Sequence, residues 1–156
     1  MTEVSKAAIG SMRCKPVPEQ NYHLTLAFLG NAPREAIPNI IAAARGMHFE
    51  AFTLRLDGFA CWSRSQIAWL GPQQCPKALK CLVNNLWTAL EPLGFKPNPR
   101  PFVPHVSIAR RVSGATDVHL ETETIEWTVD DFVLVKSKTL PTGAVYTPLE
   151  HFPAAG

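Results

Sequence analysis

Residues 22–30 read Tyr-His-Leu-Thr-Leu-Ala-Phe-Leu-Gly, and residues 104–112 read Pro-His-Val-Ser-Ile-Ala-Arg-Arg-Val. Both stretches contain histidine, an aliphatic residue, a hydroxyl residue, a second aliphatic residue and alanine in that order. This period of two is typical of a half-buried β-strand. Because successive side chains on a strand point to opposite faces, His23 should share a face with Thr25, and His105 with Ser107. The repetition indicates two related half-sites that meet.

The opposite face of each predicted strand is apolar. In the first stretch it carries Leu24, Leu26 and Phe28; in the second it carries Val106, Ile108 and the aliphatic stem of Arg110. These side chains are expected to pack into a core, which leaves the histidines and hydroxyls on the exposed side of their strands.

Length and composition indicate a globular protein with one core. The chain has 156 residues, 46% of them hydrophobic and 18% charged, with a net charge of +2. These values exclude a disordered chain and neither require nor exclude a nucleic-acid ligand. The cysteines match no zinc or Cys-x-x-Cys pattern, so four free thiols are expected at Cys14, Cys61, Cys75 and Cys81.

No apolar run approaches the length of a membrane span, and residues 1–13 lack the apolar core of a signal peptide. We therefore expect a cytoplasmic protein with no membrane partner.

Several further elements follow from periodicity. A helix is predicted within residues 2–12, and a second that either begins near Ile37 or kinks at Pro38. The clearest helix covers residues 75–93, where leucines recur at helical spacing before Gly94. Strands are predicted at residues 52–59, with a turn at Asp57-Gly58, and at residues 67–70, 124–129, 131–136 and 144–149.

This order of elements favours an α+β fold. The expected arrangement is two lobes of antiparallel sheet flanked by helices, with the two histidine strands facing each other across a central cleft.

Two histidines on opposite sides of one substrate atom can supply both halves of general acid–base catalysis, because an imidazole with a pKa near ~6.5 can take or give a proton at neutral pH. Such a pair suits in-line displacement at phosphorus, with one histidine acting on the attacking oxygen and the other on the leaving oxygen. The hydroxyls of Thr25 and Ser107 can donate hydrogen bonds to the non-bridging phosphate oxygens. This scheme requires no metal and no cofactor.

The alternatives to this interpretation are a metal site and a chance match. A metal site lacks a convincing third ligand, since Asp57, Asp130 and Asp131 share no face with the histidines. One His-x-Thr is weak evidence, but two copies in matching context are much stronger. An arginine beside the second stretch, such as Arg110, could bind phosphate, although a solvated surface arginine is an equally ordinary interpretation. Trp62, Arg64 and Phe102 are candidates for lining a substrate groove or are simply core and loop residues.

The paired motif resembles that of the 2H phosphoesterase superfamily. With its flanking residues, which include Trp69-Leu70-Gly71, Arg100-Pro101-Phe102-Val103-Pro104 and Tyr146-Thr147-Pro148-Leu149, the chain from about Cys14 onward is similar to the bacterial RNA 2',3'-cyclic phosphodiesterase (2'-5' RNA ligase) family.

The resemblance implies a bilobal α+β fold with pseudo-twofold symmetry, one motif per lobe, and hydrolysis of 2',3'-cyclic phosphate ends of RNA to 2'-phosphomonoesters. It makes His23 the proton donor to the leaving 3'-oxygen and His105 the base that activates water. It also makes Thr25 and Ser107 the phosphate-binding hydroxyls, where serine replaces the more common threonine at 107, and matches Arg110 to a phosphate-contacting arginine. Members of the family also join tRNA halves through a 2'-5' bond without ATP.

We expect one domain over residues 1–156, present as a monomer. Family members usually begin with an apolar strand before the first helix, and this chain starts at that helix, so the strand is expected to be missing or shortened. Two other functions remain open: a phosphodiesterase for small cyclic nucleotides or 2'-5' oligonucleotides, and a non-catalytic module that binds RNA ends.

Overall fold

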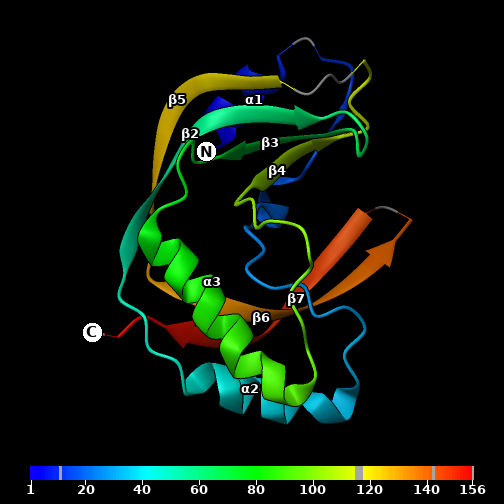
Figure 1. Ribbon diagram of the computed structural model, residues 1–156. Coiled ribbons are helices and arrows are strands. Elements are labelled where there is room, and N and C mark those ends of the chain that lie inside the picture. The colour runs from blue at the N-terminus through cyan, green and yellow to red at the C-terminus, as the bar shows by residue number, and fades with distance from the viewer. Residues whose placement is uncertain (11, 115–117, 142, 156) are drawn as a thin grey trace. The chain divides into compact units, whose positions relative to one another are not determined.

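The computed structural model describes residues 1–10, 12–114, 118–141 and 143–155, and the side chains at 118–121 lie outside that description. The chain forms two compact units. The first comprises Met1–Thr25, Leu54–Cys75 and Val103–Trp127; the second comprises Leu26–Thr53, Pro76–Phe102 and Thr128–Gly156. One sheet has five strands and the other has two, and helices accompany both, so the predicted α+β class is confirmed (Figure 1).

The first unit is built on the five-stranded sheet, whose strand order is β1-β4-β3-β2-β5. Its strands are β1 (Lys15–Pro16), β2 (Phe52–Trp62), β3 (Ile67–Gly71), β4 (Val106–Arg110) and β5 (Val118–Val129). β4 pairs antiparallel with both β1 and β3, and β3 pairs antiparallel with β2. β4, which contains the second histidine motif, is therefore an interior strand with a neighbour on each side.

One face of this sheet packs into an apolar core. Its buried members come from β2, β3, β4 and the second residue after β4: Phe59, Cys61, Ala68, Leu70, Ile108, Ala109 and Val112. The first helix, α1 (Thr2–Ile9), covers this core with Val4, Ala8 and Ile9. The helix predicted within residues 2–12 is confirmed over residues 2–9, and Ser11 lies outside the described residues.

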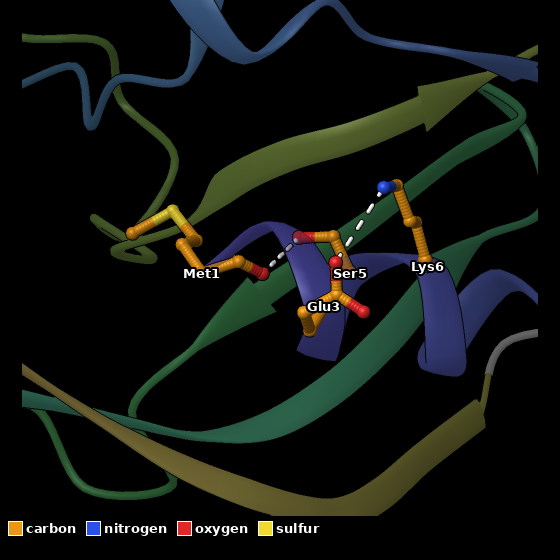
Figure 2. Close-up of polar contacts among 4 residues, drawn as sticks. All are labelled: Met1, Glu3, Ser5 and Lys6. Atoms are coloured by element: carbon orange, nitrogen blue, oxygen red, sulfur yellow. Dashed lines mark hydrogen bonds and ion pairs between the residues drawn. The ribbon is translucent and has the colours of Figure 1, made fainter.

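Local contacts hold the first turn of α1 in place. Ser5, which is 1% exposed, donates a hydrogen bond from its Oγ to the Met1 carbonyl at 3.0 Å (Figure 2). Lys6 and Glu3, one turn apart, form an exposed ion pair at 3.5 Å, also seen in Figure 2. An exposed pair of this kind adds little stability, so the packing of Val4, Ala8 and Ile9 on the sheet accounts for most of what holds the helix.

β2 is longer than predicted, because no turn forms at Asp57-Gly58. The strand continues to Trp62 in register with β3, where Gly58 lies opposite Gly71 and Cys61 opposite Ala68. The sequence Asp-Gly is a common turn signal. Here the residues after the glycine pair with β3 and bury Phe59 and Cys61 in the core, and this burial outweighs the local signal.

The second unit combines two helices with a two-stranded antiparallel sheet. Its elements are α2 (Ile37–Arg45), α3 (Lys77–Leu90), β6 (Asp131–Leu140) and β7 (Gly143–Pro153), and two short 3-10 turns adjoin the helices at Arg34–Ala36 and Glu91–Leu93. α2 begins at Ile37 with Pro38 in its first turn, as one of the two predicted alternatives. The core of the second unit contains Ile40, Leu86 and Leu90, with Phe132 and Leu134 packed against them.

Candidate functional site

β4 confirms the strand predicted for the second motif, but it contains a β-bulge that changes which side chains share a face. Ala109 lies opposite Ala68, whereas the next residue of β3, Trp69, lies opposite Ser107. Ile108 is therefore the extra residue, and it is buried together with Ala109. One extra residue moves every later side chain to the other face of the sheet.

This bulge corrects the predicted position of Arg110. Strict alternation predicts that its stem shares a face with Val106 and Ile108. In the structure Arg110 lies opposite Ile67 of β3, and Ile67 shares its face with Trp69 and hence with Ser107. Arg110 is exposed on this face. The bulge thus places a cation on the same side of the sheet as the second motif's histidine and hydroxyl.

The first motif is not a regular strand. Residues 22–30 make a single antiparallel bridge, between Leu24 and Val106 of β4. The predicted alternation fails after Thr25, because Leu26, Ala27 and Leu29 pack against the core of the second unit and Phe28 is 77% exposed. The apolar residues at 26, 27 and 29 do pack into a core, as the hydrophobic pattern indicates. This core is that of the second unit, and the second half of the stretch does not pair with a sheet.

The bridge brings the two motifs side by side. In an antiparallel pair, the residue before Leu24 lies across from the residue after Val106. His23 therefore lies next to Ser107, and Thr25 next to His105. All four residues belong to the first unit, which corrects the expectation of one motif per lobe. Each histidine has the hydroxyl of the other motif as its neighbour.

Both imidazoles make the same local hydrogen bond. His23 Nδ1 lies 2.7 Å from the Asn21 carbonyl oxygen, and His105 Nδ1 lies 2.8 Å from the Val103 carbonyl oxygen. A carbonyl oxygen only accepts, so each ring carries its proton on Nδ1 and donates it. In each ring Nε2 is then the nitrogen available for proton exchange with a substrate. In both motifs the histidine bonds the carbonyl of the residue two positions before it, so the two repeats share a local structure as well as a sequence pattern.

The electrostatic setting of His105 favours its neutral form. Burial lowers the pKa of His105, and the nearby charges of His23 and Arg110 act in the same direction, against the opposing effect of the hydrogen bond to Val103. A neutral imidazole with a free Nε2 is a proton acceptor.

Two tryptophans border His105, and the sequence alone suggested only Trp62 as a residue of the site. Trp62, at the end of β2, has its ring centroid 4.6 Å from that of His105, and Trp69 of β3 lies 6.0 Å away. Trp69 is 4% exposed and lies on the Ser107 face. Its position beside the histidine depends on strand register, which no local sequence signal gives.

Gly71 allows β3 and the approach to β4 to come close together. A Cβ at this position would lie 2.5 Å from the Pro104 carbonyl oxygen and 2.8 Å from Cζ3 of Trp69. Real Cβ atoms do not approach other atoms this closely. The glycine therefore keeps both Trp69 and the residue before His105 in place.

Among the residues that the structure describes, no three His, Cys, Asp or Glu side chains come together to hold a metal ion. Within the described part of the chain, the cysteines form no disulfide. Within the same described ranges, none of the helices has the length and apolar character that crossing a membrane would require.

The sequence and the structure both match known proteins. Residues 2–140 match the family described as the 2'-5' RNA ligase superfamily. The RNA 2',3'-cyclic phosphodiesterase of Escherichia coli is 34% identical over 138 residues, covering 88% of this chain and 78% of the relative. The protein of the same name from Thermus thermophilus is 35% identical over 152 residues, covering 91% and 76%.

Among solved structures, Escherichia coli LigT complexed with 3'-AMP superposes with a TM-score of 0.86 at 30% identity, covering 100% of this chain and 94% of LigT. The complex of LigT with phosphate gives a TM-score of 0.78 at 30% identity, covering 92% and 81%. The paired histidine motifs, the fold and the sequence match lead to one conclusion: this chain belongs to the 2'-5' RNA ligase superfamily.

Proposed function

We propose that this protein hydrolyses 2',3'-cyclic phosphodiester ends of RNA to 2'-phosphomonoesters, with His23 as general acid and His105 as general base. The main support is the arrangement around the Leu24–Val106 bridge, where two imidazoles that donate from Nδ1 lie beside each other's hydroxyl residues. Relatives named RNA 2',3'-cyclic phosphodiesterase supply the reaction class and the RNA substrate.

The reaction is an in-line displacement at phosphorus. His105 Nε2 takes a proton from water as the water oxygen attacks the cyclic phosphate. The bond from phosphorus to the 3'-oxygen breaks, and His23, protonated on Nε2, gives its proton to that oxygen. The products are a 2'-phosphomonoester and a 3'-hydroxyl. Exchange of both protons with solvent restores the resting enzyme.

The remaining site residues stabilise charge on the phosphate. Thr25 and Ser107 donate hydrogen bonds to its non-bridging oxygens, where hydroxyls placed in advance lower the barrier. Arg110 binds the same group, because the bulge at Ile108 puts it on the Ser107 face. The lowered pKa of His105 supports its role as the base, since the resting enzyme then holds this residue neutral.

A substrate with sulfur in place of the 3'-oxygen tests the two histidine roles separately. A thiolate is a much weaker base than an alkoxide, so this leaving group needs no proton from the enzyme. We expect His23→Ala to abolish turnover of the normal cyclic phosphate and to leave substantial turnover of the sulfur analogue. His105→Ala should inactivate the enzyme toward both. Equal losses on the two substrates for both variants would contradict the assignment of acid and base.

The same geometry accepts a ribose 5'-hydroxyl in place of water, which would join two RNA ends through a 2'-5' phosphodiester without ATP. The family description supports this second reaction. Incubation of a cyclic-phosphate RNA with a 5'-hydroxyl RNA, followed by digestion with a nuclease specific for 3'-5' bonds, tests it. A resistant junction is the expected product, and a mixture that contains only the hydrolysed end would count against ligation.

We further propose that the protein acts in the cytoplasm as a monomer and that residues 1–156 form one functional domain. The RNA substrate of the relatives supports the location. Sedimentation of the purified protein tests the monomer. Thermal unfolding tests the single domain, which should unfold in one cooperative transition that coincides with the loss of activity, whereas two separate transitions would count against it.

A further inference from the structure

The imidazole of His105 is part of a cluster of three aromatic rings. The Trp62 ring meets it at 72° with centroids 4.6 Å apart, and the Trp69 ring meets it at 63° with centroids 6.0 Å apart. The two indoles also contact each other, at 5.0 Å and 45°. The two edge-to-face pairs with His105 have separations at which aromatic rings attract each other beyond the area that they bury.

The two tryptophans differ in how they are held. Trp69 is almost fully buried in the middle of β3, and Gly71 leaves space for its ring. Trp62 is the last residue of β2, is half-buried, and precedes an exposed turn at residues 63–66. Trp69 is thus fixed by the sheet, and Trp62 lies against both Trp69 and the histidine.

The hydrogen bond from His105 Nδ1 to the Val103 carbonyl restrains one edge of the imidazole but not the tilt of the ring about that bond. The direction of Nε2 depends on this tilt. A ring packed edge-to-face at 4.6 Å restricts it, because tilting would bring the two rings into overlap.

We infer that Trp62 is a positioning residue for His105: its indole, supported by Trp69, holds the imidazole plane and excludes water from that side, so that Nε2 points at the attacking water. The inference rests on the proposed role of His105 as the base. It assigns Trp62 no direct contact with the reacting atoms.

The same packing explains the charge state of the imidazole. Burial is the main cause of the lowered pKa of His105, with smaller contributions of the same sign from His23 and Arg110. Trp62 supplies part of that burial. When the indole is removed and the other groups remain, the pKa of His105 should rise toward the ordinary imidazole value of ~6.5.

The test compares Trp62→Ala, Trp62→Leu and Trp62→Phe with Trp127→Ala. Trp127 is a half-buried tryptophan near the end of β5 and serves as a matched control. Two quantities are measured: the titration of the His105 imidazole by NMR in the free protein, and the pH dependence of kcat and kcat/KM on a cyclic-phosphate RNA. The His105 signal is identified by its loss in His105→Gln.

We expect Trp62→Ala to raise the pKa of His105, to move the acid limb of kcat/KM to higher pH, and to lower kcat about 10-fold or more with a smaller change in KM. Trp62→Leu should behave similarly, and it replaces the alanine variant if that one fails to fold. Trp62→Phe should retain most of the activity because it keeps an aromatic ring, and Trp127→Ala should leave the titration unchanged.

Two results would overturn the inference. A pKa that stays constant or falls in both Trp62→Ala and Trp62→Leu would mean that the indole does not bury the neutral ring. A rise in KM at constant kcat would make Trp62 a substrate-binding residue instead. The titration needs no substrate, so it decides the packing argument even if the wild-type enzyme proves inactive on cyclic phosphates, an outcome that would refute the proposed function separately.

Discussion

The substitution Gly71→Ala adds a single methyl group on β3, and this group should disturb the histidine site on the neighbouring strand β4. The added Cβ would lie 2.5 Å from a backbone oxygen, that of Pro104, and 2.8 Å from the Trp69 ring. The backbone oxygen cannot move aside as the end of a flexible side chain could. Either β3 and the segment before His105 separate, or the Trp69 ring leaves its position.

The loss of unfolding free energy can be estimated from other packed cores, where an extra methyl group without space destabilises the protein by about 1–3 kcal/mol. In a domain of this size each kcal/mol lowers Tm by about 2–4 °C, so the expected decrease is about 2–12 °C. The folded variant should also lose activity, because a catalytic group misplaced by about 1 Å can lower the rate about 10²-fold. Thermal unfolding by circular dichroism and kcat at a temperature where the variant is folded measure the two effects.

Two other glycines serve as controls. A Cβ at Gly58 would lie 3.2 Å from the Gly71 carbonyl oxygen, so Gly58→Ala should cost less than Gly71→Ala. At Gly46 the nearest atom is 3.5 Å away, an ordinary contact, and its φ of −73° suits any residue, so Gly46→Ala should leave Tm equal or slightly higher. A Gly71→Ala enzyme with the Tm and kcat of the Gly46→Ala enzyme would refute this reasoning.

Three further predictions follow from the site and the second unit. Because burial lowers the pKa of His105, the acid limb of kcat/KM should lie below about pH 6.5, which a pH–rate profile measures. For the same reason His105 should contribute stability that is present above about pH 6.5 and lost as the pH falls through its folded pKa, which acid unfolding curves measure. Thr25→Val and Ser107→Ala should each lower kcat by about 10²-fold with little change in Tm, and wild-type kcat in either would exclude its hydroxyl from transition-state binding. The 2.6 Å pair between Arg45 and Glu150 is largely exposed at the arginine, so Arg45→Ala should cost at most about 1 kcal/mol of unfolding free energy and leave kcat unchanged, which denaturant titration can check.

Local patterns predicted the elements whose packing is also local. The helix α3 follows the spacing of Leu79, Leu82, Val83 and Leu86, all of which are buried on one side. The strand β4 follows the alternation of the second motif from Val106 to Ile108. Over α3 and this part of β4, one face of the element meets one core, so the sequence period and the burial pattern agree.

Features that depend on pairing between distant segments were missed. The bulge at Ile108 is set by how β4 registers with β3, and it reverses the predicted face of Arg110. The first motif divides between two cores after Thr25, which alternation alone does not reveal. Trp69 reaches His105 only because β3 and β4 are neighbours. The identity of the two histidines was available from sequence, and the surroundings that orient them were not.

The most direct measurement of the central claim is product identification in the presence of EDTA. A short RNA ending in a 2',3'-cyclic phosphate is incubated with the wild-type enzyme, His23→Ala or His105→Ala, and the product is identified by mass and by its sensitivity to phosphatase. The account predicts a 2'-phosphate end from the wild-type enzyme and unchanged substrate from both folded variants. A 3'-phosphate product, or full turnover by either variant, would contradict it.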